Sequence, residues 1–294
     1  MAYELKQGEK LNHGIRRIAR KQVQRILCDL THSREPKAER VHEARKNLKK
    51  ARAALRLVRD ELGDRHYQRD ARHLRKVARG LSDERDAQVQ LQTAEKLLDE
   101  PHAKLLREGL MKLHRVLKER LREALHQSNG NGKKFQSELR AAQRHAKKWP
   151  VGNLTWTDLA CGIGQTYKRG SEAFQVAGRT RKPEDLHEWR KRAKDLWYQL
   201  RILKPVDEQD IASLADQMKK LGQLLGDDHD LFMIGEASKT AELNCRELEA
   251  IADLVHRRRK RLQREAFQLG RRLFSPKPSE FVRRIESYGQ GNGN

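Results

Sequence analysis

One basic helical stretch occurs twice in the sequence, and this internal repeat constrains the fold more than any other feature. The segment VHEARKNLKKARAALRLV at 41–58 aligns with LHEWRKRAKDLWYQLRIL at 186–203, at a constant offset of 145 residues. Two shorter matches flank this repeat. Downstream, LRKVARGLSDERDAQV at 74–89 aligns with MKKLGQLLGDDHDLFM at 218–233, and upstream, LNHGIRRIARK at 11–21 aligns with LACGIGQTYKR at 159–169. Three blocks repeated in order predict two copies of one helical unit, arranged as two bundles related by an approximate two-fold axis.

The rest of the chain has the same helical periodicity, and no segment alternates as a strand would. We therefore predict an all-α fold. Pro, Gly and Asn residues divide the chain into amphipathic segments at 8–31, 37–62, 66–98, 102–127, 134–148, 154–177, 184–203, 208–225, 228–242 and 244–271.

These segments suggest a division of the chain into four parts. Residues 1–128 are expected to form the first helical-bundle repeat and 151–272 the second. Residues 129–150 are expected to be a linker with a short helix, because their start is rich in Gly and Asn. Residues 273–294 are expected to be a flexible tail.

The composition indicates an anionic partner. The chain has 64 Lys and Arg residues against 41 Asp and Glu, which gives a formal net charge of +23. Neither a signal peptide nor a run of apolar residues long enough to span a bilayer is found, so we expect a cytoplasmic protein without membrane contact. Cys28, Cys161 and Cys245 lack the spacing of a zinc site or a disulfide framework, and we expect them to be reduced and packed.

The repeated segment has two faces when it is drawn as a helix. Its apolar face consists of Val41, Ala44, Leu48, Ala51, Leu55 and Val58. An adjoining stripe, about 21 Å long, consists of His42, Arg45, Lys46, Lys49, Arg52 and Arg56. Like charges in such a stripe repel one another, and the second copy keeps His, Arg, Lys and Arg at four of these positions. This pattern favours a ligand-binding face over a merely solvated one.

A line of cations suits an extended polyanion better than a single phosphate, which needs a compact nest or a helix N-terminus. Nucleic acid and inorganic polyphosphate both meet this requirement. Proteins that bind single strands stack bases on aromatic side chains, and the first stripe has none. Trp197 replaces Arg52 in the second stripe, whereas Trp189 lies on the apolar face and is expected in the core. A ligand without bases fits better, with nucleic acid as the second alternative.

Several catalytic chemistries have no support in the sequence. The segments HEARK and HEWRK lack the second His of a zinc-protease helix, and no Gly-rich phosphate loop is present. The pairs Arg85–Asp86 and His229–Asp230 are interpreted as salt bridges or helix caps that orient nearby cations. No acidic cluster suited to Mg²⁺ accompanies the stripe. We therefore expect no catalytic residues, no metal and no cofactor.

These residues resemble those of the CHAD family, the conserved-histidine α-helical domain. The resemblance rests on the doubled H-x-x-R-x-x-x-K signature, on LSDERDAQV and on TYKRG, and it covers residues 8–271. It implies two four-helix bundles with pseudo-two-fold symmetry and a basic groove or channel between them. It also implies a non-enzymatic module that binds inorganic polyphosphate in the cytoplasm and can associate with polyphosphate granules.

The sequence thus predicts one polyphosphate-binding groove lined by both repeats. The first repeat is expected to contribute Arg16, Arg20, His42, Arg45, Lys46, Lys49, Arg52, Arg56 and Lys76. The second is expected to contribute Lys168, His187, Arg190, Lys191, Lys194, Arg201 and Lys220.

Overall fold

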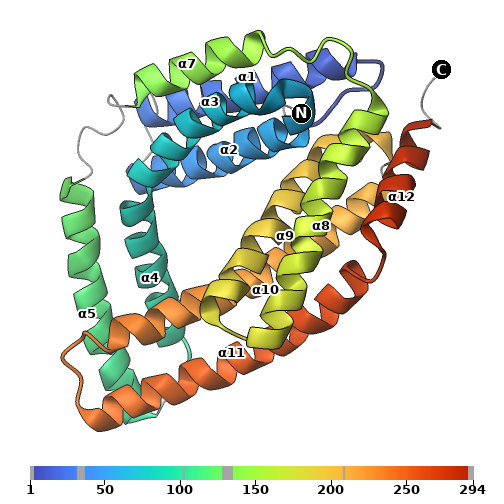
Figure 1. Cartoon of the computed structure of the whole chain (residues 1–294). Helices are drawn as coiled ribbons and strands as arrows, with labels where there is room; N and C mark the ends of the chain where they lie inside the picture. The colour runs from blue at the N-terminus through green and yellow to red at the C-terminus, as the bar shows by residue number, and fades with distance from the viewer. Residues whose placement is uncertain (1–2, 32–36, 102, 128–134, 208, 291–294) are drawn as a thin grey trace.

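The computed structural model describes residues 3–31, 37–101, 103–127, 135–207 and 209–290. These residues form eleven α-helices and one 3₁₀-helix, with no strand among them, which confirms the all-α prediction (Figure 1). The elements are α1 (Leu11–Thr31), α2 (Lys37–Leu57), α3 (Arg59–Gly80), α4 (Ser82–Leu98), α5 (Lys104–Gln127), α7 (Gln136–Lys147), α8 (Trp156–Thr180), α9 (Pro183–Leu203), η1 (Lys204–Val206), α10 (Asp210–Ser238), α11 (Cys245–Leu273) and α12 (Pro278–Gln290).

Four helices make a closed cycle of contacts: α2 packs on α4, α4 on α10, α10 on α9, and α9 back on α2. In Figure 1 these four helices frame the centre of the molecule. Helices α1, α3 and α7 pack with α2 on one side, and α8 and α12 pack with α9 on another. Helix α5 runs beside α4 and reaches α11. The cycle brings together helices that are far apart in the sequence.

The buried apolar residues form two clusters. The larger one joins α1, α2, α3 and α7 to α8, α9, α10 and α12. The smaller one joins Leu110, Leu113 and Leu117 of α5 to Ile234 of α10 and Ile251 of α11. Each cluster therefore draws on both halves of the chain.

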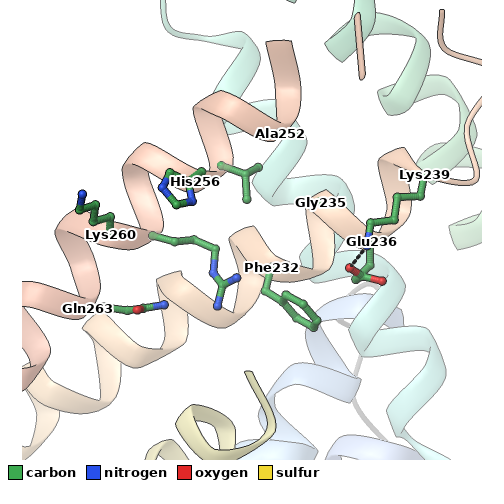
Figure 2. A pocket seen from close by; sticks show the side chains of 10 residues that line it. Phe232, Gly235, Glu236, Lys239, Ala252, His256, Lys260 and Gln263 are labelled. Carbon is green, nitrogen blue, oxygen red and sulfur yellow. Dashed lines mark hydrogen bonds and ion pairs between the residues drawn. The ribbon is translucent and has the colours of Figure 1, made fainter. Parts of the chain in front are cut away.

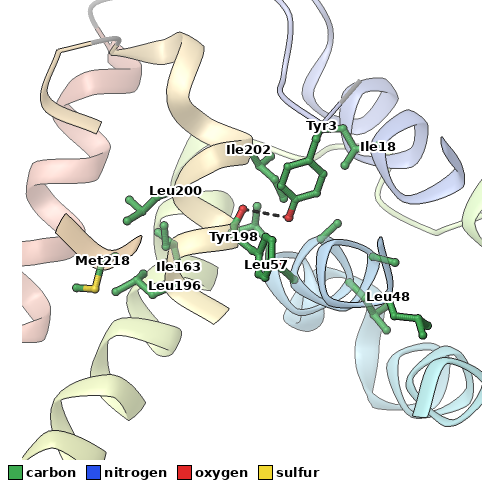
Figure 3. Packing of buried hydrophobic residues seen from close by; sticks show 14 of the residues in the cluster. Tyr3, Ile18, Leu48, Leu57, Ile163, Leu196, Tyr198, Leu200, Ile202 and Met218 are labelled. Carbon is green, nitrogen blue, oxygen red and sulfur yellow. Dashed lines mark hydrogen bonds between the residues drawn. The ribbon is translucent and has the colours of Figure 1, made fainter. Parts of the chain in front are cut away.

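The contact between α2 and α9 is fixed by the N-terminal segment and by buried side chains (Figure 3). The Tyr3 hydroxyl donates to the Tyr198 carbonyl at 3.0 Å, and the Leu5 amide donates to the Ile202 carbonyl at 3.0 Å. The Gln199 side chain donates to the Ala53 carbonyl of α2 at 3.5 Å. These contacts set the position of one repeated helix against the other.

The structure corrects two of the expected helix boundaries. The segments 208–225 and 228–242 were expected to be separate, but α10 runs through them without a break. Gly226, which suggested a helix end, is buried beneath the Arg190 side chain, so its small size serves close packing. The segment 66–98 was expected to be continuous, but it divides at Leu81 into α3 and α4.

The tail expected to be flexible contains α12 over 278–290. Its Phe281 and Ile285, one helical turn apart, are buried in the larger cluster, and the Tyr167 ring stacks on Phe281 with centroids 4.0 Å apart. The spacing of these apolar residues explains why the segment folds on α8. The expected linker contains α7, and the three cysteines are free but exposed rather than packed.

Candidate functional site

Helix α2 has the two faces that its sequence predicts. The apolar residues are each no more than 4 % exposed, namely Val41, Ala44, Leu48, Ala51, Leu55 and Val58. Their burial turns the adjoining basic stripe of α2 away from the core. The opposing helix α9 buries Trp189 completely, as expected for its apolar face.

Part of the α2 stripe lines a pocket of about 310 Å³ between α2 and α3. Five cations and no carboxylate line it: Arg45, Lys49, Arg52, Arg75 and Arg79. The Arg45 guanidinium is held in place because its Nη1 donates to the Leu81 carbonyl at 2.8 Å. That carbonyl is available because the helix breaks at Leu81. The pocket is suited to anion binding.

Lys49 lies where the two repeats face each other. Water reaches its side chain, but protein atoms surround it closely enough that burial lowers the pKa of its ammonium group. The charges of Arg190, Arg45, Lys194 and Arg85 lower that pKa further, to about 8. The cations of α2 and α9 are therefore close enough to repel one another.

On α9, Arg190 and Lys194 lie against two glycines of α10. A Cβ atom at Gly226 would lie 3.3 Å from Arg190 Nη2, and one at Gly222 would lie 3.0 Å from Lys194 Cδ. The pKa of Lys194 is lowered to about 8 by burial, followed by the charges of Arg190 and Lys219. The small residues of α10 thus make room for the cations of α9.

The signature histidine His187 and its neighbour His229 are not among the cations of this surface. Burial, followed by neighbouring positive charges, lowers the pKa of His187 to about 4, and the same causes lower that of His229 to about 4. The two rings are in contact, with centroids 4.3 Å apart. Burial and Arg85 also lower the pKa of His42. His187 is therefore neutral at pH 7 and adds no charge to the stripe of α9.

Carboxylates lie among these cations. Asp86 Oδ1 is 3.5 Å from Arg45 Nη2, in agreement with the interpretation of Asp86 as an orienting partner. Burial raises the pKa of Asp230, partly opposed by the charge of Arg190. Within the described residues, no three His, Cys, Asp or Glu side chains come together as metal ligands would. The carboxylates serve to hold the arginines.

Several of the predicted site residues have other partners. Arg16 Nη2 donates to the Trp149 carbonyl at 2.6 Å, and Lys76 pairs with Glu138 of α7. Arg56 Nη1 lies 2.8 Å from Asp195 Oδ1 of α9. These three residues are engaged in packing between helices.

The remaining predicted residues lie toward the edges of the cationic surface. Lys46 and Lys191 each pair with a glutamate three residues earlier on the same helix. The Arg201 guanidinium carbon lies 5.4 Å from the ring centroids of both Tyr3 and Trp197. Arg20, Lys168 and Lys220 are exposed and have no ion pair among the described residues.

Four cations of the surface were not predicted: Arg75 and Arg79 of α3, Arg85 of α4 and Lys219 of α10. Alignment of the repeats pointed instead to Lys76 and Lys220, each one residue beyond Arg75 and Lys219. One residue turns a helix by about 100°, which is enough to move a side chain to another face. The spacing of Arg75 and Arg79, four residues apart on α3, was the available signal.

Comparison with known proteins agrees with this architecture. The family model of the CHAD domain matches residues 17–239, which is more than half of the chain. The chain belongs to the CHAD domain family. A crystal structure of the CHAD domain from the plant Ricinus communis is similar in fold, with a TM-score of 0.64, 14 % sequence identity, and coverage of 94 % of this chain and 96 % of that one. No curated protein matches the chain.

The resemblance drawn from the doubled signature is thereby confirmed. In this CHAD domain the signature residues Arg45, Lys49, Arg190 and Lys194 are the ones that the fold brings together. Their chemistry is that of anion binding, with bidentate arginine forks beside lysine point charges. None of the described helices has both the length and the apolar composition of a membrane span.

Proposed function

We propose that this CHAD domain binds inorganic polyphosphate on the cations of α2, α3, α4, α9 and α10, without catalysing a reaction. One observation carries the proposal: the charges of Arg190 and Lys194 in the second repeat contribute to the lowered pKa of Lys49 in the first, on the helix α2 that packs on α9. The carboxylates near these cations do not offset the repulsion fully, because burial and the neighbouring cations still lower the pKa of Lys49 and that of Lys194 to about 8. A polyanion laid across both helices would relieve that repulsion.

The pattern of helix contacts supports a pseudo-two-fold arrangement of the two repeats. Helix α7 packs on α1 as α12 packs on α8, and α1 packs on α2 as α8 packs on α9. Two pairs of equivalent helices, α2 with α9 and α5 with α11, also contact each other. Contacts between equivalents are expected beside a two-fold axis. On this basis the binding groove lies between the repeats, and α12 belongs to the second copy.

The lining of the pocket favours polyphosphate over nucleic acid. Among the described residues, no aromatic side chain lines the pocket on α2 and α3. The aromatic residue of the second stripe, Trp197, is partly buried against the core, and the Lys194 ammonium lies 4.6 Å from its ring centroid. A single-stranded nucleic acid would find little aromatic surface on which to stack its bases.

Charge reversal of Arg45 and Arg190 together tests the proposal. The double variant R45E/R190E is expected to lose long-chain polyphosphate binding by at least about 100-fold, because two close phosphate contacts become repulsive. The matched control is K104E/R122E, which changes the net charge equally at side chains that are 91 % and 66 % exposed. Circular dichroism checks that both variants remain helical. Equal loss of affinity in the two variants would contradict a defined site.

Salt dependence and competition complete the test. The logarithm of the affinity should fall with the logarithm of the salt concentration by roughly 0.7 per phosphate contact, if single-strand behaviour applies. Single- and double-stranded DNA are added as competitors at equal phosphate concentration. If DNA displaces polyphosphate as well as unlabelled polyphosphate does, the protein is a general polyanion binder and the proposed specificity is wrong.

A further inference from the structure

A second concentration of positive charge lies on α11, away from the signature residues. The segment HRRRKRLQR at 256–264 contains six Lys and Arg residues and no acid. Arg258 pairs with Glu100, and Arg259 Nε lies 3.0 Å from Asp228 Oδ1. The exposed cations for which the described part of the chain shows no ion pair are Arg257, Lys260, Arg261 and Arg264. The proposed polyphosphate groove leaves these charges unused.

Beside this segment, a pocket of about 590 Å³ between α10 and α11 opens to solvent (Figure 2). The lining includes two small residues, Gly235 on α10 and the exposed Ala252 on α11. Buried Val255 and half-buried Phe232 supply apolar surface. The Arg259 guanidinium carbon lies 5.0 Å from the Phe232 ring centroid. The volume is in the range of small-molecule sites, which are typically about 300–1,000 Å³.

The rim of this pocket is polar and carries a positive charge. Lys239 Nζ lies 2.6 Å from Glu236 Oε1, so the carboxylate of the lining is already neutralised. Lys260 and His256 are exposed and have no ion pair among the described residues. Gln263 donates its amide to Asp228 at 2.8 Å, which leaves its oxygen as an acceptor. An apolar floor with phosphate-binding groups on one side and an amide oxygen on another has the chemistry of a nucleotide site.

We propose that this pocket binds a mononucleotide, with the base against Phe232, Arg259 and Val255 and the phosphates on Lys260 and His256. A guanidinium and an aromatic ring both offer flat faces to a base. A nucleic acid strand fits less well, because Phe232 is the only phenylalanine, tyrosine or tryptophan among the described residues that line the pocket, and it provides a stacking surface for one base. The site is separate from the polyphosphate groove and does not depend on it.

The test uses ATP as the probe and isothermal titration calorimetry at physiological ionic strength. The variant K260E should weaken ATP binding at least tenfold. The matched control R264E lies one turn further along α11, carries the same charge change and does not line the pocket. Its ATP affinity should stay within about twofold of the unmodified protein. An equal loss in both variants would reduce ATP binding to general attraction by the basic surface and overturn the proposal.

A second variant changes shape without changing charge. A252F fills the pocket from an exposed position, so the fold should be kept and ATP binding should be lost. Polyphosphate binding by A252F should be unchanged. Tripolyphosphate should compete with ATP at this site at least tenfold more weakly than ATP itself, since it lacks a base. Equal competition, or tighter binding of a short oligonucleotide than of ATP, would overturn the assignment to a mononucleotide.

The groove variant R45E/R190E separates the two proposals. If ATP binding persists in that variant while polyphosphate binding is lost, both proposals stand. If ATP binding is lost as well, ATP occupies the groove and the separate site is disproved. If both polyphosphate binding and ATP binding persist, the proposed function fails and the nucleotide site is unaffected.

Discussion

Polyphosphate binding should depend steeply on pH above neutrality because of Lys49 and Lys194. Both have a pKa of about 8, lowered by burial and by neighbouring cations. A bound polyanion favours the charged form and returns each pKa toward its usual value near 10.4. In the free protein each lysine is about 90 % charged at pH 7 and about 10 % charged at pH 9. If both must be charged in the complex, the affinity falls by about 100-fold between these pH values.

Polyphosphate binding should also be accompanied by proton uptake. At pH 8 each lysine is about half neutral before binding, so the complex should take up about one proton in total, and almost none at pH 6.5. Calorimetric titration with long-chain polyphosphate, in buffers of different ionisation enthalpy, measures this number directly. Long chains are used because they have few terminal groups that titrate.

The variant K49R/K194R is the control, because arginine keeps its charge throughout this pH range. It should bind polyphosphate with nearly the same affinity at pH 7 and pH 9 and should take up no proton at pH 8. An unmodified protein whose affinity is the same at both pH values would refute the reasoning. So would an equal fall of affinity in the arginine variant.

Three further outcomes are expected. The variant G226A should weaken polyphosphate binding several-fold without lowering the melting temperature, because its Cβ displaces the Arg190 guanidinium while alanine favours the helix. G162A should lower the melting temperature by at least about 5 °C, because its Cβ would lie 1.9 Å from the Leu57 carbonyl oxygen and force α8 away from α2. G152A, whose Cβ meets nothing within 4 Å, is the control for both, and equal effects in it would contradict these assignments. The ligand-free protein should gain stability between pH 8 and pH 10. In this range lysines of the unfolded chain still bind protons, whereas Lys49 and Lys194 of the folded protein have largely lost theirs. Thermal denaturation should show a smaller gain in K49R/K194R, and an equal or larger gain there would contradict the argument.

The helix content and the two faces of α2 could be predicted from the sequence because they follow from local periodicity. Leu48 and Lys49 are neighbours in the chain, and their separation onto an apolar and a basic face requires only the helical repeat. The matching helix α9 followed from the internal alignment. Arg45, Lys49, Arg190 and Lys194 were all identified in this way.

The contributions of α3 and α10 could not be predicted in the same way. Whether Arg75 or Lys76 faces the cations of α2 depends on how α3 is rotated against α7: Arg75 lines the pocket with them, whereas Lys76 pairs with Glu138 of α7. The same one-residue difference separates Lys219 from Lys220 on α10. Rotation about a helix axis is set by packing with other helices, and no pattern within a single segment specifies it. For the same reason Gly226 suggested a helix end, although its function is to accommodate Arg190.

The smaller core cluster has a consequence for the order in which the chain folds during synthesis. The ribosome has completed α4 and α5 once it reaches residue 127. The apolar side chains of these two helices are covered by α10 and α11, which together span residues 210–273. A ribosome adding about 5–20 residues per second therefore leaves Leu110, Leu113 and Leu117 without their final partners for several seconds. An N-terminal half expressed alone would present these leucines to solvent and aggregate, and supplying the C-terminal half in the same cell should restore its solubility.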